Sequence, residues 1–185
     1  MIFNGEMVRA ILDGGKTQTR RPVKVPHIDK DAMCELSGNE LAGELLAGNY
    51  RNSPHGKPGD RIWVRETWAR YNIDQDSHDM AYRATPPADW PEEGRWRPSI
   101  HMPRWASRLM LEITGVRVER LQAITLGDIC KEIGCGLYDF RPATYGFQVW
   151  EELWKSIYWE ENWQANPWVW VIEFKVVPNV QDNPA

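Results

Sequence analysis

The chain has 185 residues, a formal net charge of -4 and a sequence pI near 5.6. This length suits one domain with a sizeable core. The acidic balance excludes a basic field over the whole surface, so any contact with nucleic acid must use a local patch. The longest apolar runs are strand-sized and no signal peptide is recognisable, so we expect a cytoplasmic protein that does not enter a membrane.

Candidate metal ligands are sparse. The three cysteines are Cys34, Cys130 and Cys135, without a C-x-x-C pair, and the four histidines lie far apart in the sequence. Zinc sites in proteins draw on closely spaced cysteine and histidine pairs. We therefore expect neither a metal nor another cofactor.

The first predicted element is an amphipathic helix with Asn4 as N-cap and Gly14 as C-cap. Its apolar residues recur at three- and four-residue spacing: Met7, Val8, Ile11 and Leu12. The chain then turns at the two glycines and continues as a strand, because two threonines and Pro22 disfavour a helix there.

The octet from Gly14 to Arg21 reads G-G-K-T-Q-T-R-R and holds the most informative side chains of the sequence. In a strand, Thr17, Thr19 and Arg21 share one face, while Lys16 at the turn can reach either face. A nucleotide-binding P-loop is excluded, because position 10 is alanine and the order is helix then strand. The simplest alternative is a solvated basic turn made by Lys16, Arg20 and Arg21.

The middle of the chain is less regular. Residues 23–56 are rich in Gly, Asn and Pro, with a short helix near Glu40 to Leu46. A turn at residues 57–60 leads into a strand from Arg61 to Trp68, for which Asp79 to Ala84 is a candidate partner. The proline-rich residues 85–105 have no period and predict a long loop or flap.

The C-terminal part carries the clearest elements. Ser107 to Arg120 is the longest strand candidate, with a bulge or bend at Gly115. Thr125, with Asp128 three residues later, is the N-cap of a short helix that runs through Glu132. A helix at residues 143–158 and a strand at 168–177 follow, and residues 179–185 form a flexible tail.

Eleven tryptophans are unusual for this length. Most fit a core: one face of the last strand carries Trp168, Trp170, Ile172, Phe174 and Val176, and one stripe of the preceding helix carries Phe147, Trp150, Leu153, Trp154 and Ile157. The flap differs, because its tryptophans alternate with arginines: Trp90, Arg95, Trp96, Arg97, Arg104, Trp105 and Arg108. Such residues either stack on nucleic-acid bases or pin the flap by packing and cation–π contacts.

Several strands, three short helices and no βαβ alternation predict an α+β fold built on a small mixed or antiparallel barrel with short flanking helices. No repeat and no second core is visible. The sequence therefore predicts a single domain over residues 1–178, with insertions around 23–56 and 70–105.

The octet resembles the signature of the ASCH-domain family, G-x-K-x-x-E-x-R, within the PUA-like superfold of small RNA-associated β-barrels. Thr19 replaces the usual glutamate, as it does in bacterial ASCH proteins that act as acetylcytidine amidohydrolases. Further similar segments are the Pro58-Gly59-Asp60 turn, the helix within 121–132 and V-I-E-F-K at 171–175. The stretch from Arg97 to Trp105 is similar to prophage-encoded ASCH proteins of unassigned role.

The resemblance implies an amide hydrolase in which Lys16 is the base, Thr19 the nucleophile and Glu132 the proton donor. Arg21 would orient the substrate, and the further candidates for substrate binding are Arg20, Trp63, Arg104 and Trp105. The match at Glu132 departs from the family, because Ile133 follows it where relatives often have glycine.

The resemblance implies an N4-acylated cytidine as the substrate, and the residue types suit hydrolysis of its amide. A threonine hydroxyl needs a base to take its proton, and lysine serves only if burial or a neighbouring cation lowers its pKa. In the simplest structural reading, Lys16 and Glu132 form a salt bridge and Thr19 is an ordinary strand residue. Single-stranded RNA binding or RNA cleavage is the alternative function, with Lys16, Arg20 and Arg21 on phosphate and Trp96 or Trp105 on a base. A non-enzymatic module that binds a modified nucleotide is a third possibility.

Overall fold

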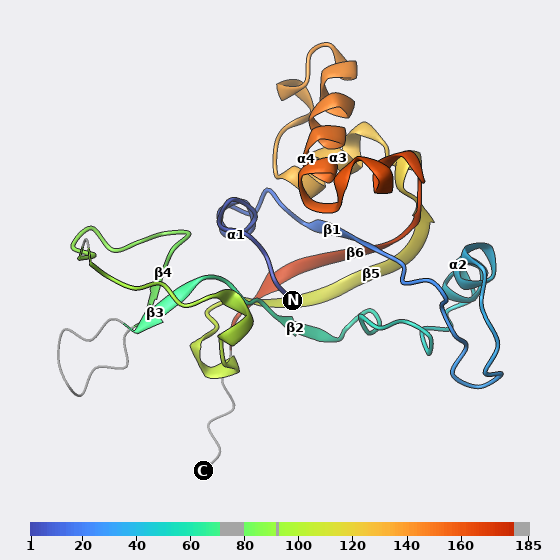
Figure 1. The fold of residues 1–185 in the computed structure, drawn as a ribbon, viewed down its shortest axis with the longest axis horizontal. Helices are drawn as coiled ribbons and strands as arrows, with labels where there is room; N and C mark the ends of the chain where they lie inside the picture. The colour runs from blue at the N-terminus through green and yellow to red at the C-terminus, as the bar shows by residue number, and fades with distance from the viewer. Residues whose placement is uncertain (71–79, 92, 180–185) are drawn as a thin grey trace.

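The computed structural model describes residues 1–70, 80–91 and 93–179 (Figure 1). Its centre is a curled, four-stranded antiparallel sheet in the order β1-β6-β5-β2. The strands are β1 (Gln18–Pro22), β6 (Trp168–Val177), β5 (Met110–Arg120) and β2 (Arg61–Trp63). With helices at its flanks, this half-barrel confirms the predicted α+β class and is consistent with a small PUA-like barrel.

The predicted strand from Arg61 to Trp68 is wrong in its extent. It is divided into β2 and β3 (Trp68–Arg70), and β3 pairs with β4 (Met80–Tyr82) in a separate two-stranded sheet. The division has a physical cause, because the N-terminal segment lies beside the chain at Arg65. The Arg65 amide donates to the Met1 carbonyl at 2.7 Å. The backbone of this segment therefore bonds to the N-terminus after residue 64 and no longer to β5.

Three helices have strong local start signals. In α1 (Gly5–Leu12), Asn4 Oδ1 accepts from the Met7 amide at 2.8 Å, as predicted. A capping box formed by Ser37 and Glu40 begins α2 (Gly38–Leu46), and Thr125 caps α3 (Leu126–Ile133).

The fourth helix, α4 (Ala143–Gln164), is longer than the predicted range. Its regular geometry is interrupted at Trp159, which has a φ of 70° and is 76% exposed. The predicted apolar stripe is correct for Trp150 and Trp154, each 2% exposed, but wrong for Phe147 and Ile157, which are 43% and 42% exposed. The short apolar face is sufficient because α4 covers only one end of the sheet (Figure 1).

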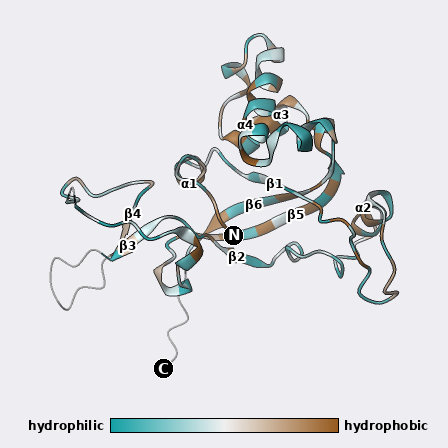
Figure 2. Ribbon diagram, in the orientation of Figure 1, coloured by the Kyte–Doolittle hydropathy of each residue, from teal (hydrophilic) through white to brown (hydrophobic). Residues whose placement is uncertain are grey.

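Strand β6 has buried residues on both faces, and strongly hydrophobic segments alternate with less hydrophobic ones along the sheet (Figure 2). Val169 and Val171 pack with α3 and α4 in a cluster that we call the helical core. Trp170 and Ile172 pack on the other face, in a cluster with Leu41 and Leu45 of α2. The predicted single buried face is thus incomplete, and it ends before Val176, which is 46% exposed.

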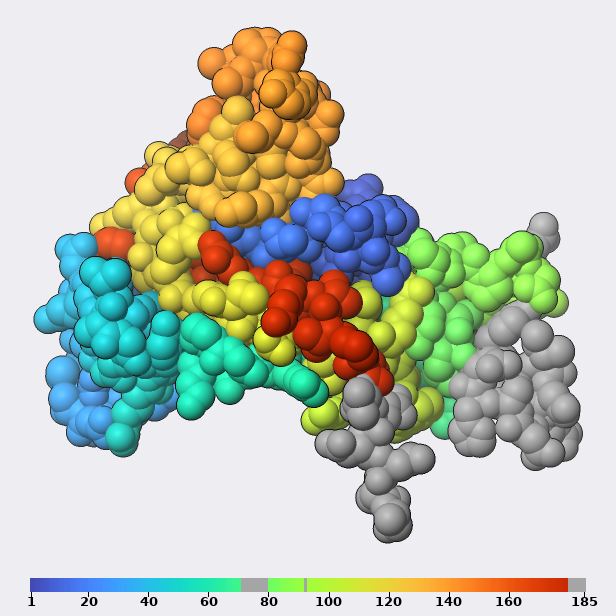
Figure 3. Space-filling view, turned by 180° about the vertical axis from the view of Figure 1, so that it is seen from behind, coloured from blue at the N-terminus to red at the C-terminus, as the bar shows by residue number. Residues whose placement is uncertain are grey.

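Residues 121–165 stand as a projection above the sheet when the molecule is seen from behind (Figure 3). The N-terminal residues lie at the base of this projection, so the octet of residues 14–21 is close to it. None of the described helices combines the length and the hydropathy that a bilayer crossing needs. Of the predicted tail, residues 180–185 lie outside the described residues, as do 71–79 and 92 of the predicted insertion at 70–105.

Candidate functional site

The two glycines of the octet bring its backbone against the end of α3. A Cβ atom on Gly15 would lie 2.7 Å from the Gly134 carbonyl oxygen, so a larger residue does not fit there. The Lys16 amide donates to the Ala10 carbonyl at 2.9 Å, and the Thr17 amide donates to the Lys131 carbonyl at 3.0 Å. The Lys16 side chain therefore begins directly beside α3.

Glu132 of α3 is the point at which the predicted site residues meet. Lys16 Nζ donates to Glu132 Oε1 at 3.2 Å and to the Glu132 carbonyl at 2.5 Å, and it also donates to the Gln18 carbonyl at 2.8 Å. The Arg20 amide donates to Glu132 Oε1 at 3.0 Å, and Arg20 Nη1 donates to Oε2 at 3.3 Å. Residues 116 positions apart in the sequence are thus in direct contact.

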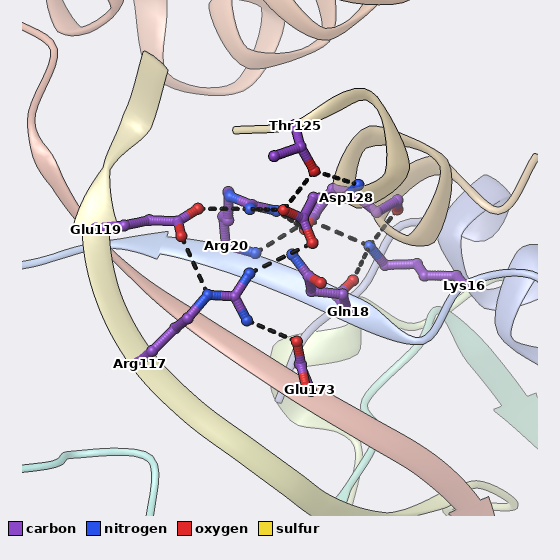
Figure 4. Close-up of polar contacts among 9 residues, drawn as sticks. Lys16, Gln18, Arg20, Arg117, Glu119, Thr125, Asp128 and Glu173 are labelled. Atoms are coloured by element: carbon purple, nitrogen blue, oxygen red, sulfur yellow. Dashed lines mark hydrogen bonds and ion pairs between the residues drawn. The ribbon is translucent and has the colours of Figure 1, made fainter. Parts of the chain in front are cut away.

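The network extends to two more strands, β5 and β6 (Figure 4). Arg20 Nη2 donates to Glu119 Oε1 at 2.6 Å, and it lies 3.8 Å from Asp128 Oδ2. Arg117 of β5 binds Glu119, Asp128 and Glu173. Because Lys16 and Arg20 are 1% and 2% exposed, the alternative of a solvated basic turn is wrong for both of them.

Sequence reasoning missed most of this network. Its unpredicted members are Gln18, Arg117, Glu119, Asp128 and Glu173. The period of two was a usable signal, because it places Gln18 and Arg20 on the same face of β1 and Arg117 and Glu119 on the same face of β5. Nothing local, however, indicated that these faces meet α3.

The environment of Lys16 lowers its pKa below the ordinary value, mainly because burial disfavours the ammonium ion. Glu132 acts in the opposite direction, through charge and a hydrogen bond, while Arg21 and Arg20 add to the lowering. Lys16 is therefore easier to deprotonate than a surface lysine.

Thr19 and Glu132 line the same narrow recess between β1 and α4, and Arg20 and Arg21 line it too. The volume of this recess is about 20 Å³, and its far wall includes Trp150. Thr19 is 2% exposed. The recess accommodates one water-sized group, whereas small-molecule pockets usually measure about 300–1,000 Å³.

Arg21 is held at the edge of the recess. Its Nη2 donates to the Ile2 carbonyl at 2.7 Å, and its guanidinium lies 5.5 Å from the centroid of the Phe3 ring. These contacts fix the direction of the side chain toward the N-terminal segment.

The remaining candidates for substrate binding are not brought to the recess. Trp63 lies in β2, with the Arg65 guanidinium 4.4 Å from its ring centroid. Arg104 and Trp105 form part of the 3₁₀ helix η2 (Arg104–Ala106), near the end of the sheet away from α3 and α4 (Figure 1). The Trp105 ring meets the edge of Trp68 at 5.9 Å and is 47% exposed.

Other tryptophans of the flap pack against protein groups. Trp90 and Trp96 stack on each other with centroids 4.1 Å apart, and the Arg97 guanidinium lies 5.2 Å from the Trp68 ring centroid. These contacts agree with a flap pinned by packing and cation–π interactions.

A larger cavity, of about 420 Å³, lies between the start of α1 and the segment around β3 and β4. It is lined by Arg9, Glu66 and Arg83 among others, and the predicted site residues do not line it. Across residues 1–70, 80–91 and 93–179, no three His, Cys, Asp or Glu side chains are grouped as metal ligands would be.

No family model matches the chain, and no curated protein matches it. A crystal structure of a protein from Enterococcus faecalis V583, assigned to the family model DUF984, is similar over 97% of this chain and 75% of that chain. The sequence identity is 10% and the TM-score is 0.43. At such similarity no function is carried from one protein to the other.

Proposed function

We propose that this chain is an ASCH-type amidohydrolase that removes a small acyl group from an N4-acylated cytidine. The observation that supports this proposal is that three motif residues, Thr19, Arg21 and Glu132, line the recess. Lys16 does not line it but is hydrogen-bonded to Glu132.

In the proposed reaction, neutral Lys16 takes the proton of the Thr19 hydroxyl, and Thr19 Oγ1 forms a bond to the acyl carbon. The 3.2 Å contact between Lys16 Nζ and Glu132 Oε1 is a path by which that proton passes to the carboxylate. Glu132 then protonates the leaving N4 nitrogen as the C–N bond breaks. Water then hydrolyses the acyl-threonine, which releases the carboxylic acid and restores the Thr19 hydroxyl. The products are free cytidine, the acid and the unchanged enzyme.

The size of the recess sets a limit on what enters it. A volume of about 20 Å³ admits the acyl group's carbonyl but not a nucleoside. In the proposed complex the acyl oxygen therefore enters, and the pyrimidine and ribose remain at the mouth, near Arg21.

The test is hydrolysis of N4-acetylcytidine by the purified chain, with cytidine release measured by chromatography. Thr19→Val removes the hydroxyl and preserves the shape, so we expect kcat to fall at least about 100-fold. Thr17→Val is the matched control, because Thr17 precedes β1 and does not line the recess. No hydrolysis by the unmodified chain would reject the function, and an active Thr19→Val variant would reject the nucleophile.

RNA binding or cleavage is the second candidate, and it is favoured by one observation. Trp105 is 47% exposed beside an exposed Arg104, with the Arg70 guanidinium 5.4 Å from its ring centroid. Such a surface suits an unpaired base and its phosphate. A labelled single-stranded RNA, tested for binding, for cleavage and for loss of acyl groups, separates the candidates. Binding with neither cleavage nor loss of acyl groups would favour a binding module.

A further inference from the structure

Two buried N–H groups beside the recess have no acceptor among the described residues. They are Arg20 Nε and Trp150 Nε1. Each residue is only 2% exposed, so water outside the molecule does not serve them. A buried donor left without an acceptor costs about 1–3 kcal/mol, and native structures rarely retain two of them close together without a reason.

Both residues line the same recess, and Arg20 Cζ lies 5.8 Å from the centroid of the Trp150 ring. The two terminal nitrogens of Arg20 are already engaged with Glu132 and Glu119, which fixes the guanidinium and leaves Nε for another partner. The arrangement is thus rigid before any ligand arrives.

Lack of a partner is not general to the tryptophans of α4. Trp154 is equally buried, but its Nε1 donates to Asn162 Oδ1 at 2.9 Å. One turn of helix therefore separates a satisfied indole N–H from an unsatisfied one, although both tryptophans line the recess.

The volume of about 20 Å³ matches one oxygen atom and its immediate bond. The group that fits must accept hydrogen bonds, because Arg20 Nε–H and Trp150 Nε1–H are both donors. The charges of Arg20 and Lys16 are compensated by Glu132, Glu119 and Asp128. The remaining cation, Arg21, is held at the edge of the recess by the Ile2 carbonyl and the Phe3 ring. These conditions favour a neutral carbonyl oxygen that gains negative charge only during reaction.

We propose that Arg20 Nε–H and Trp150 Nε1–H bind the acyl oxygen of the substrate and stabilise the oxyanion that forms on it. This inference rests on the proposed function. When Thr19 Oγ1 bonds to the acyl carbon, the C=O π electrons move to this oxygen, and both N–H groups donate to it. When the electrons return, the C–N bond breaks and the amine leaves with the proton from Glu132. The same donors serve the attack of water on the acyl-threonine.

The test compares two phenylalanine substitutions in one helix. Trp150→Phe removes the N–H and retains an aromatic ring, and we expect kcat to fall at least about tenfold with KM changed less than threefold. Trp163→Phe changes a tryptophan of the same helix that does not line the recess, and kcat should remain within about twofold. Urea midpoints of both variants show that each is folded.

The indole ¹⁵N–¹H signal of Trp150, assigned by its loss in Trp150→Phe, gives a readout that does not need turnover. We expect N4-acetylcytidine added to the Thr19→Val variant to shift this signal more than the signal of Trp163, which does not line the recess. If the unmodified chain hydrolyses the substrate but Trp150→Phe is as active, the oxyanion role is wrong and the proposed function stands. If no hydrolysis occurs, the proposed function fails, and the oxyanion role fails with it. The change in the Trp150 signal then shows whether these donors bind a carbonyl ligand at all. A Trp150 signal that does not move, as expected if a trapped water already occupies the recess, would contradict such binding.

Discussion

Glu132 shows how much of the site depends on single side chains. Its carboxylate accepts from Lys16 and from both the amide and the guanidinium of Arg20. Removal of one member of a buried charged pair leaves its partner uncompensated, which is far more costly than the pair is stabilising. Substitutions at Lys16 or Glu132 therefore report on folding as well as on chemistry, which is why the proposed tests use Thr19 and Trp150.

A half-buried group, His55, gives the molecule a pH-dependent stability. Burial is the main reason that the pKa of His55 is lowered from 6.5 to about 4, and the positive charges of Arg21 and the N-terminal amine add to the effect. Between these two values the unfolded chain binds a proton that the folded chain does not. The stabilising contribution is thus complete above pH 6.5 and is lost as the pH falls toward 4.

We expect this loss to be about 1–3 kcal/mol of unfolding free energy. Urea unfolding at several pH values measures it, and His55→Gln should flatten the pH dependence in that window. The exposed His101 provides the control, because His101→Gln should keep the slope of the unmodified chain. An equal slope in His55→Gln would contradict the assignment. Burial also lowers the pKa of the Met1 amine to about 6, and this group contributes equally to the pH dependence of stability in all variants.

At the scale of elements, the turn after α1 and the end of α3 hold each other in place. Gly134 ends α3 with a φ of 90°, and a Cβ there would lie 2.8 Å from Ala10 Cβ and 3.1 Å from the Lys16 amide nitrogen. A side chain at this position would therefore push the octet away from α3 and separate Lys16 from Glu132.

Gly134→Ala should consequently lower both stability and hydrolysis. Gly48→Ala is a matched control, since Gly48 has a φ of 80° but open space around its Cβ position. The control carries only the backbone strain, which costs about 1 kcal/mol of unfolding free energy. We expect Gly134→Ala to lower the unfolding free energy by at least about 1 kcal/mol more than the control does. Equal unfolding free energies for the two variants would show that the contact with Ala10 and Lys16 is unimportant.

The elements also show why sequence reasoning succeeded in some places and not in others. Helix starts at Asn4 and Thr125 were predictable because a cap depends on residues three positions apart. The end of β2 was not, because it depends on the arrival of Met1 beside Arg65. Likewise, the burial of Arg20 depends on carboxylates at positions 119, 128 and 132, whose proximity only the folded chain creates.

On the scale of the whole molecule, β6 joins clusters that are otherwise separate. Val169 and Val171 belong to the helical core, Trp170 and Ile172 to the cluster with α2, and Phe174 to the cluster with α1. An element shared in this way couples the stability of its neighbours. The site depends on that coupling, because Glu132 comes from the projection and Thr19 from the sheet.

We therefore expect the chain to unfold in one cooperative transition, seen at the same urea concentration by far-UV circular dichroism and by tryptophan fluorescence. Val171, fully buried in β6, tests the coupling. Val171→Ala should lower the unfolding free energy by about 2 kcal/mol and shift both signals together. Val25→Ala, at a position 83% exposed, should change it by less than about 0.5 kcal/mol. If Val171→Ala instead separated the transitions, with helical signal lost before the sheet melts, the projection would be an independent unit. The relay from Lys16 to Glu132 would then depend on docking of that unit, and not on the fold as a whole.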